Sequence, residues 1–535
     1  MSTLSLITHG AAADAVTAHV PQLVEDRFAS RLFAQDATLW GDEAQDEASI
    51  RLGWVEATAV SRPLVESIEA LAEQLRAEGV RTVILAGMGG SSLAPEVITA
   101  TAGVELTVLD STDPQQVRAA LGDRVAEAVL VVASKSGSTV ETDSQRRAAE
   151  EAFRAAGMDP RQRIVVVTDP GSPLDEAARE AGYRAVFTAD PHVGGRYSAL
   201  TAFGLVPSGL AGVDLVGLLD DAESVIDVLA LDEADNPGLQ LGAALAGTQP
   251  LRDKLIIQDL GSGIVGFGDW AEQLVAESTG KHGRGLLPVV VEADAPETTS
   301  DAADVLQVVL TAETDDEAAV PEHGVLLAGS LGAQLLLWEV ATAVAGRLLE
   351  INPFDQPDVE AAKVAARALL QGEAPAEVAS VPVGPVQVAG LPQGVEASSL
   401  SEVLEVLLGQ VGEDGYVAVQ AYLDRLGDRR LEQLRPALAR RSGRPVTFGW
   451  GPRFLHSTGQ LHKGGPRTGV FLQLVTDDAE DLPVPGRAFS FGTLIAAQAA
   501  GDAEVLRGHG LTVITVQLPQ REAGIEALLE AAGAL

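Results

Sequence analysis

The sequence predicts an α/β protein that contains two doubly wound parallel-sheet domains and a third α/β domain after them. Short β-rich runs alternate with amphipathic stretches from residue 82 onward, which is the pattern of strand–helix–strand units. A linker rich in Pro, Gly, Ala and Glu interrupts the alternation between Gly372 and Val386. With 535 residues and 46% hydrophobic content, the chain can form about two to four domains with their own cores, which excludes intrinsic disorder.

Four segments are expected: a helical lead-in over residues 1–60, α/β domains over 61–235 and 236–372, and a C-terminal α/β domain over 373–535. Strands are predicted at residues 82–86, 105–109, 128–133, 163–168, 185–188, 254–259, 287–292, 305–310, 416–421, 446–448, 470–474 and 512–517. Helices are predicted at residues 115–121, 139–156, 174–181, 214–229, 239–246, 333–349, 430–440 and 493–500. Ligands of such sheets bind beyond the carboxyl ends of the strands, so the loops after Ala86 and Ala133 are the first candidates for a site.

The composition excludes several classes of function. The net charge of −39 repels nucleic-acid backbones and anionic membranes, and the sequence contains no basic patch that would offset it. The absence of cysteine excludes disulfides, thiolate metal sites and a cysteine nucleophile. No apolar run approaches the roughly 18–20 residues of a membrane-spanning helix, and the first basic residue, Arg27, comes too late for a signal peptide. We therefore expect a cytoplasmic protein whose ligand is a small molecule.

Two loops carry residues that suit a bound anion. Gly87–Ser92 follows a predicted strand, and its glycines allow a close backbone approach to a ligand. A dinucleotide fingerprint would need Gly or Ala in place of Ser92, which leaves a tight turn as the main alternative. The loop Ser134–Thr139 combines four hydroxyls with Lys135, one of only five lysines in the chain. An ordinary helix cap explains one hydroxyl and not all four, so this loop predicts a phosphate site.

Three further segments carry candidate catalytic groups. Gly194 and Gly195 precede Arg196, and the two glycines suggest that its guanidinium is held against a ligand or an anionic intermediate. The ordinary alternative is a solvated surface arginine. On the predicted helix 270–281, Gln273 and Glu277 are four residues apart and share a face, as in any stabilising helix pair. After the turn at residues 351–357, Gln356 and Lys363 are seven apart and also share a face, which a capped solvent helix explains equally well.

Taken in order along residues 80–363, these five motifs resemble those of glucose-6-phosphate isomerases, which have two sugar-isomerase (SIS-type) domains. The resemblance implies an aldose–ketose isomerase of glycolysis and gluconeogenesis, a homodimer without metal or cofactor that uses an enediolate intermediate. It implies Glu277 as the base, Arg196 beside the reacting carbons and Lys363 as an aid to ring opening. It further implies a sugar phosphate pocket formed by Gly90, Ser91, Ser134, Lys135, Ser136, Thr139, Glu141, Gly195, Gln273 and Gln356.

The sequence departs from the family pattern at two points. Asp358 replaces the glycine that usually precedes Val-Glu at the start of the lysine helix. The active-site histidine that the family contributes across a dimer interface has no counterpart among His282 and His323. The segment Trp450–Pro466 is similar to the tail of fused transaldolase/glucose-6-phosphate isomerase proteins and contains two histidines. We therefore expect His456 or His462 to supply the missing group; the alternative is a structural or subunit-contact loop.

Two alternative functions stay open at this stage. The first is a sugar-phosphate isomerase of broader specificity, which also accepts mannose 6-phosphate and fits the same motifs. A non-catalytic sensor of sugar phosphates would keep the Ser134–Thr139 loop but would have no need of Glu277 or Lys363. A transcriptional sensor would add a basic DNA-binding module, and the acidic composition argues against one.

Overall fold

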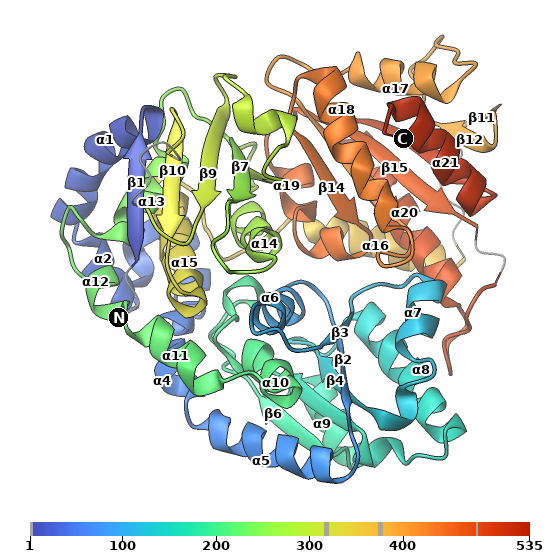
Figure 1. Cartoon of the computed structure of the whole chain (residues 1–535), viewed down its shortest axis with the longest axis horizontal. Coiled ribbons are helices and arrows are strands. Elements are labelled where there is room, and N and C mark those ends of the chain that lie inside the picture. Colours follow the sequence, from blue (N-terminus) through green and yellow to red (C-terminus); the bar gives the residue numbers. More distant parts are fainter. Residues whose placement is uncertain (1–3, 315–319, 373–377, 478–479, 535) are drawn as a thin grey trace.

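The computed structural model describes residues 4–314, 320–372, 378–477 and 480–534. These residues form three α/β units, each with its own mainly parallel sheet (Figure 1). None of the described helices is long and apolar enough to cross a membrane. The fold class expected from the sequence is therefore confirmed.

The first sheet is parallel throughout and has the strand order β3-β2-β4-β5-β6. Its strands are β2 (Thr82–Gly87), β3 (Thr107–Leu109), β4 (Ala128–Ala133), β5 (Ile164–Thr168) and β6 (Ala185–Thr188). Strands β2, β4 and β5 are buried on both faces, as the continuous runs of apolar residues predict. Alternate residues point to α5 (Leu64–Ala77) and α10 (Ala202–Ala211) on one face, and to α7 (Pro114–Ala120), α8 (Val140–Ala155) and α9 (Pro173–Ala181) on the other.

The second sheet has the order β1-β10-β9-β7-β8. Its parallel strands are β7 (Lys254–Asp259), β8 (Leu287–Val291), β9 (Val305–Leu310) and β10 (Gly324–Ala328), and its helices include α13 (Pro237–Ala246), α14 (Phe267–Thr279) and α15 (Leu331–Leu348). The lead-in is not helical throughout, because β1 (Ser5–His9) pairs antiparallel with the edge of β10. Helices α1 (Ala11–Glu25), α2 (Phe28–Phe33), α3 (Asp42–Ala48) and α4 (Ala57–Ser61) follow.

The third sheet has the order β11-β12-β16-β15-β13-β14. It contains β13 (Tyr416–Tyr422), β14 (Val446–Trp450), β15 (Gly469–Thr476) and β16 (Thr512–Leu518), with α17 (Leu400–Leu408), α18 (Leu434–Ser442), α20 (Phe491–Gly508) and α21 (Arg521–Ala532). Of the expected linker, residues 373–377 lie outside the described residues. The rest contains β11 (Ser380–Val383), which turns at Gly384 and pairs with β12 (Val386–Ala389), a strand that begins where the expected linker ends. This hairpin extends the sheet beyond β16.

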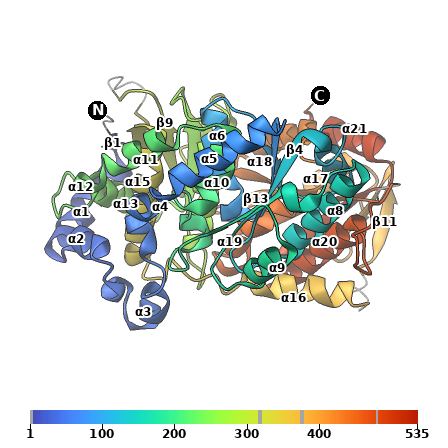
Figure 2. The same cartoon turned by 90° about the horizontal axis from the view of Figure 1, so that it is seen from below.

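The three sheets share one strand order around their first parallel strand. In each sheet, the next parallel strand along the chain lies on one side of the first, and the two parallel strands after it lie on the other side. The corresponding orders are β3-β2-β4-β5, β8-β7-β9-β10 and β14-β13-β15-β16. In the first sheet the switch point lies between β2 and β4, where the loops Gly87–Ser92 and Ser134–Thr139 begin. The third unit packs on the second through α20, which lies along α16 (Val359–Leu370), and through α19 (Gly459–Gly464), which contacts α14 (Figure 1 and Figure 2). It contacts the first unit through the turn Arg453–His456, which lies against the turn Gly89–Ser91.

Candidate active site

A buried ion pair joins the first and second units. Oε1 of Glu277, on α14, lies 3.2 Å from Nη1 of Arg196, whose side chain is 3% exposed. Arg196 sits in the turn Gly195–Tyr197, and its Nε donates to the Ser278 hydroxyl at 2.7 Å. Its other nitrogens donate to the Gln356 side-chain oxygen at 2.9 Å and to the Pro353 and Asp355 carbonyls at 2.7 and 3.0 Å. The guanidinium is thus fixed beside the carboxylate by acceptors on two other segments.

Gln273 extends this cluster by one helical turn toward the third unit. Its Nε2 donates to Oε2 of Glu277 at 2.9 Å and to the backbone carbonyl of His456 at 2.8 Å. The spacing of four residues that was noted in the sequence therefore places two polar groups in direct contact on one face of α14. Gln273 links the Glu277 carboxylate to the loop that carries His456.

The glycines of the first loop are required by close packing. Gly89 has a φ of +55°, and a Cβ there would lie 2.7 Å from Nε2 of Gln273 and 2.9 Å from the His456 carbonyl oxygen. A Cβ on Gly90 would lie 1.9 Å from the Gly195 carbonyl oxygen. The loop can therefore lie against the Gln273 and Arg196 segments only without side chains at these two positions. Ser91 is half-buried beside them.

The hydroxyl loop lines one end of a cavity of about 750 Å³. The hydroxyls of Ser134 and Thr139 form a hydrogen bond of 3.1 Å, and those of Ser136 and Ser138 form one of 2.9 Å. The cavity is lined by Ser136, Gly137, Ser138, Thr139, Glu141, Lys363, His456, Lys463, Gln498 and neighbouring residues. Lys135 points elsewhere, because its ammonium pairs with Asp169 at 2.7 Å and with the Pro191 carbonyl at 3.3 Å. The anion-binding capacity of this loop thus rests on hydroxyls and backbone N–H groups.

A histidine–carboxylate pair also lines the cavity. Nε2 of His456 lies 3.1 Å from Oε1 of Glu141, and the Gln498 amide on α20 donates to the same oxygen at 2.8 Å. Burial works to raise the pKa of Glu141, but the hydrogen bond and charge of His456 and the charge of Lys363 outweigh it and hold that pKa below its usual value. Glu141 therefore orients His456 and carries the negative charge of the pair.

The second histidine of the loop lies outside this cavity. The His462 ring is stacked on Tyr416 and set edge-on to Phe471, and its Nδ1 lies 2.8 Å from the Tyr416 hydroxyl. Burial lowers the pKa of His462 to about 3, so the ring is neutral near pH 7. Of the two histidines expected from the sequence, the structure brings only His456 to the other candidate site residues.

The substituted residue at the start of the lysine helix has a partner in the third unit. Gln460 donates from Nε2 to the Asp358 carboxylate at 2.6 Å and accepts the Asp358 backbone N–H at 3.0 Å. The same Nε2 donates to the Gly280 carbonyl at the end of α14, at 2.9 Å. One buried amide therefore ties the helix that carries Glu277 to the helix that carries Lys363. Asp358 is compatible with the turn because Gln460 forms hydrogen bonds with both its carboxylate and its backbone N–H.

Lys281 holds the loop that presents Gln356. Its ammonium is buried and donates to the carbonyls of Asn352 and Asp355, each at 2.7 Å, and to the Asp355 carboxylate at 2.6 Å. Burial, followed by the charge of Arg196, lowers the pKa of Lys281 to about 8. This lysine is thus a structural cation that fixes residues 352–355 beside Arg196.

Sequence reasoning missed three residues that shape the site. Ser278 fixes Nε of Arg196, Gln498 shares the carboxylate of Glu141, and Gln460 joins two helices across a domain boundary. The Gly-bounded segment around Gln460 was visible as an unusual loop, whereas Gln498 lies within an ordinary helix and gave no signal. Among the described residues, no three His, Asp or Glu side chains are grouped so that they could hold a metal ion.

Comparisons with known proteins agree on one family. A family model described as phosphoglucose isomerase matches residues 56–245. The chain is 32% identical over 364 residues to a probable glucose-6-phosphate isomerase of Haloarcula marismortui, an alignment that covers 58% of this chain and 83% of that protein. A probable glucose-6-phosphate isomerase of Natronomonas pharaonis is 31% identical over 379 residues, which are 62% of this chain and 87% of that protein.

Solved structures show the same fold. A hypothetical protein of Thermus thermophilus matches with a TM-score of 0.58 and 26% identity, over 69% of this chain and 100% of that one. A glucose-6-phosphate isomerase of Chlamydia trachomatis matches with a TM-score of 0.52 and 18% identity, over 69% of this chain and 88% of that one. The second likeness concerns the fold alone.

Proposed function

Because the chain belongs to the glucose-6-phosphate isomerase family, we propose that it interconverts glucose 6-phosphate and fructose 6-phosphate through an enediolate. The single observation that carries the mechanism is the buried contact between Glu277 and Arg196. A carboxylate that moves a proton between two adjacent carbons needs a fixed cation beside the oxygen on which negative charge develops. These two side chains meet that requirement with a separation of 3.2 Å.

The proposed chemical step moves protons without any net oxidation. Glu277 takes the proton from C2 of the open-chain aldose, and the released electron pair forms the C1–C2 double bond while the C1 carbonyl oxygen gains negative charge. The Arg196 guanidinium stabilises that oxygen. Glu277 then returns its proton to C1, the hydroxyl proton on O2 moves to O1, and O2 becomes the ketone. Gln273 and Gln356 hold the carboxylate and the guanidinium in place.

Substrate binding and ring opening are assigned to the large cavity. Ser136 and Thr139, which line this cavity, and the adjoining Ser134 would hold the phosphate at the N-terminal end of α8. Gly90 packs on the Gly195 carbonyl outside the lining of the cavity, and with Ser91 these glycines would lie beside the reacting carbons. His456, oriented by Glu141, would move the proton between the ring oxygen and O1, and Lys363 lines the same cavity. The homodimer and the cytoplasmic location expected from the family resemblance stay predictions.

The experiment that tests this function is conversion of fructose 6-phosphate to glucose 6-phosphate, followed through a coupled dehydrogenase. Glu277→Gln keeps the size of the side chain but removes the base, so kcat should fall about a thousandfold. Glu350→Gln, at a surface position with a 78% exposed side chain, is the control and should leave kcat unchanged. An inactive wild type that still binds the sugar phosphate would favour the sensor alternative.

A further inference from the structure

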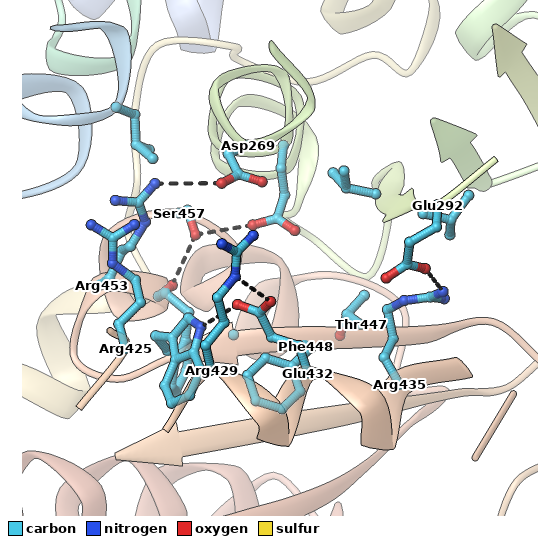
Figure 3. A pocket seen from close by; sticks show the side chains of 17 residues that line it. Asp269, Glu292, Arg425, Arg429, Glu432, Arg435, Thr447, Phe448, Arg453 and Ser457 are labelled. Atoms are coloured by element: carbon cyan, nitrogen blue, oxygen red, sulfur yellow. Dashed lines mark hydrogen bonds and ion pairs between the residues drawn. The ribbon is translucent and has the colours of Figure 1, made fainter. Parts of the chain in front are cut away.

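A second cavity, of about 330 Å³, lies between the third unit and α14 (Figure 3). It is lined by Leu93, Asp269, Glu272, Val290, Val291, Glu292, Arg425, Arg429, Glu432, Arg435, Thr447, Phe448, Gly449, Trp450, Arg453, Phe454 and Ser457. Its volume lies at the low end of the roughly 300–1,000 Å³ typical of small-molecule sites, which also favour domain interfaces. Its floor is formed by the carboxyl end of β14 and by the loop after β13, which is where open α/β sheets bind ligands.

Four arginines of the third unit line this cavity in a chain that is strongly acidic overall. Arg453 is held by Glu96 at 2.6 Å and by Asp110, and Arg435 is held by Glu297 at 2.7 Å and by Glu292. Those carboxylates fix the guanidinium groups but do not use all of their N–H donors. The buried Nε groups of Arg425 and Arg435 have no hydrogen-bond acceptor among the described residues. Unsatisfied buried donors of this kind are costly unless a ligand or water accepts from them.

Arg429 differs from the other three arginines in its exposure. Its side chain is 80% exposed and lies 3.3 Å from the Glu432 carboxylate. In Figure 3 it stands between the β14 floor and the α14 side of the cavity. An exposed ion pair of this kind contributes little to stability, so Arg429 can turn toward an incoming anion at low cost.

The α14 side of the cavity adds further donors beside the Asp269 carboxylate, which lies 3.5 Å from Nη2 of Arg453 (Figure 3). Burial, followed by the charge of Asp269, raises the pKa of Glu272 to about 8, so this carboxyl group carries a proton at neutral pH. The hydroxyls of Ser457 and Thr447 also line the cavity, and Ser457 lies 3.3 Å from Glu272. A neutral Glu272 does not repel an anion and can donate a hydrogen bond to it.

The cavity is distinct from the active site although the two share two backbone segments. On α14, Gln273 contacts Glu277 and His456, whereas the preceding Glu272 lines the second cavity. In the loop after β14, His456 lines the large cavity and Ser457 the second one. Neighbouring residues of α14 and of this loop therefore face different sites.

We propose that this second cavity binds the phosphate group of a small phosphorylated metabolite. A phosphate offers three strong acceptor oxygens, which match the separate guanidinium, hydroxyl and carboxyl donors better than the two oxygens of a carboxylate do. The net charge of −39 disfavours a nucleic-acid backbone as the source of that phosphate. A cavity of this size accommodates a compact phosphate monoester.

Calorimetric titration of the full chain with sn-glycerol 3-phosphate tests the proposal. The experiment also rests on the proposed function, because that function assigns a phosphate site to the Ser134–Thr139 loop. The wild type should bind two equivalents, one at the Ser134–Thr139 loop and one at the second cavity. Arg429→Gln should weaken only the second by about tenfold or more, because a charge-assisted contact is lost, and Arg429→Glu should abolish it. Arg440→Gln removes an equal charge from an exposed position on α18 outside the cavity and should change neither.

A second variant separates this proposal from the proposed function. Ser136→Asp places a negative charge in the hydroxyl loop and should remove the first equivalent while the second remains. Two equivalents that survive unchanged in Arg429→Glu, or a single equivalent in the wild type that only Ser136→Asp removes, would overturn the second site. Equal weakening by Arg429→Gln and Arg440→Gln would show nonspecific charge attraction and would overturn it as well.

Discussion

His456 and Glu141 are in direct contact although 315 residues separate them in the sequence, with Nε2 of the first 3.1 Å from Oε1 of the second. Glu141 belongs to the helix that follows the hydroxyl loop, and His456 belongs to the third unit. The third unit thus places an imidazole in the large cavity of its own chain. This position suits the ring-opening group for which residues 278–362 offered no clear candidate in the sequence.

We predict that His456→Ala selectively slows turnover of cyclic substrate. Its kcat/KM for fructose 6-phosphate should fall about 100-fold, because proton transfer to the ring oxygen loses its catalyst. A 5-deoxy analogue of fructose 6-phosphate lacks the hydroxyl that closes the ring, so the same variant should process it at nearly the wild-type rate. The two rates are compared in one steady-state assay.

His462→Ala is the matched control for this prediction. It removes an imidazole from the same loop but outside the cavity, so it should lower stability while the ratio of the two rates stays at the wild-type value. Equal losses on the cyclic substrate and on the analogue in His456→Ala would assign His456 to a structural role.

Gln460 should be coupled to Asp358 in its effect on stability. Gln460→Leu leaves a half-buried carboxylate and a backbone N–H without their partner, which should reduce the free energy of unfolding by about 1–3 kcal/mol. In an Asp358→Gly background the carboxylate is absent, so the same substitution should cost clearly less. A double-mutant cycle from denaturant melts measures the difference. Additive costs would show that the two residues act independently.

The pH dependence of stability should report the burial of His462. Its pKa is about 3 in the folded chain and about 6.5 when unfolded, so the unfolded chain takes up a proton first as the pH falls. The free energy of unfolding of the wild type should therefore drop, relative to His462→Phe, by about 3 kcal/mol between pH 6.5 and pH 4. Well above pH 6.5 the difference between the two proteins should be constant. A pH-independent difference over the whole range would mean that the ring protonates normally in the fold.

Glu272 should also make stability depend on pH, but in the opposite direction. Its pKa is raised to about 8, whereas the unfolded group titrates near 4.5, so the unfolded chain loses its proton first as the pH rises. Stability of the wild type relative to Glu272→Gln should be greatest below pH 4.5 and should decline up to about pH 8. Thermal melts of both proteins from about pH 4 to about pH 9 measure this, and parallel curves would contradict the assigned burial.

Local patterns predicted much of the fold and marked the loops and helices on which the candidate site residues lie. β-branched runs marked the central strands of all three sheets, because such strands are buried on both faces and read as continuous apolar segments. The edge strands β1 and β11 were missed, and so was β12, which lies between β11 and β16. Their residues are in large part only partly buried or exposed, and the pairing of β1 and β12 with the rest of their sheets depends on segments remote in the sequence. β10 is fully buried and was also missed.

The sequence could not distinguish His456 from His462, because the surroundings of each ring depend on segments remote in the sequence. Both lie in one Gly-bounded loop, and only the packing of α19 against α14 and α16 turns His462 toward Tyr416 and leaves His456 facing Glu141. Lys135 was assigned to the phosphate pocket from its neighbours, yet Asp169, which follows the adjacent strand, draws its ammonium away. Contacts between segments remote in the sequence decided both positions.

The most direct test of the central claim is deuterium incorporation during isomerisation in D₂O. An enediolate formed by Glu277 places the transferred proton on an exchangeable carboxyl group, so wild-type enzyme should place deuterium at C1 of fructose 6-phosphate. Glu277→Gln should abolish incorporation together with turnover. Complete conversion by the wild type without any deuterium at C1 would indicate direct hydride transfer between the carbons and would contradict Glu277 as the base.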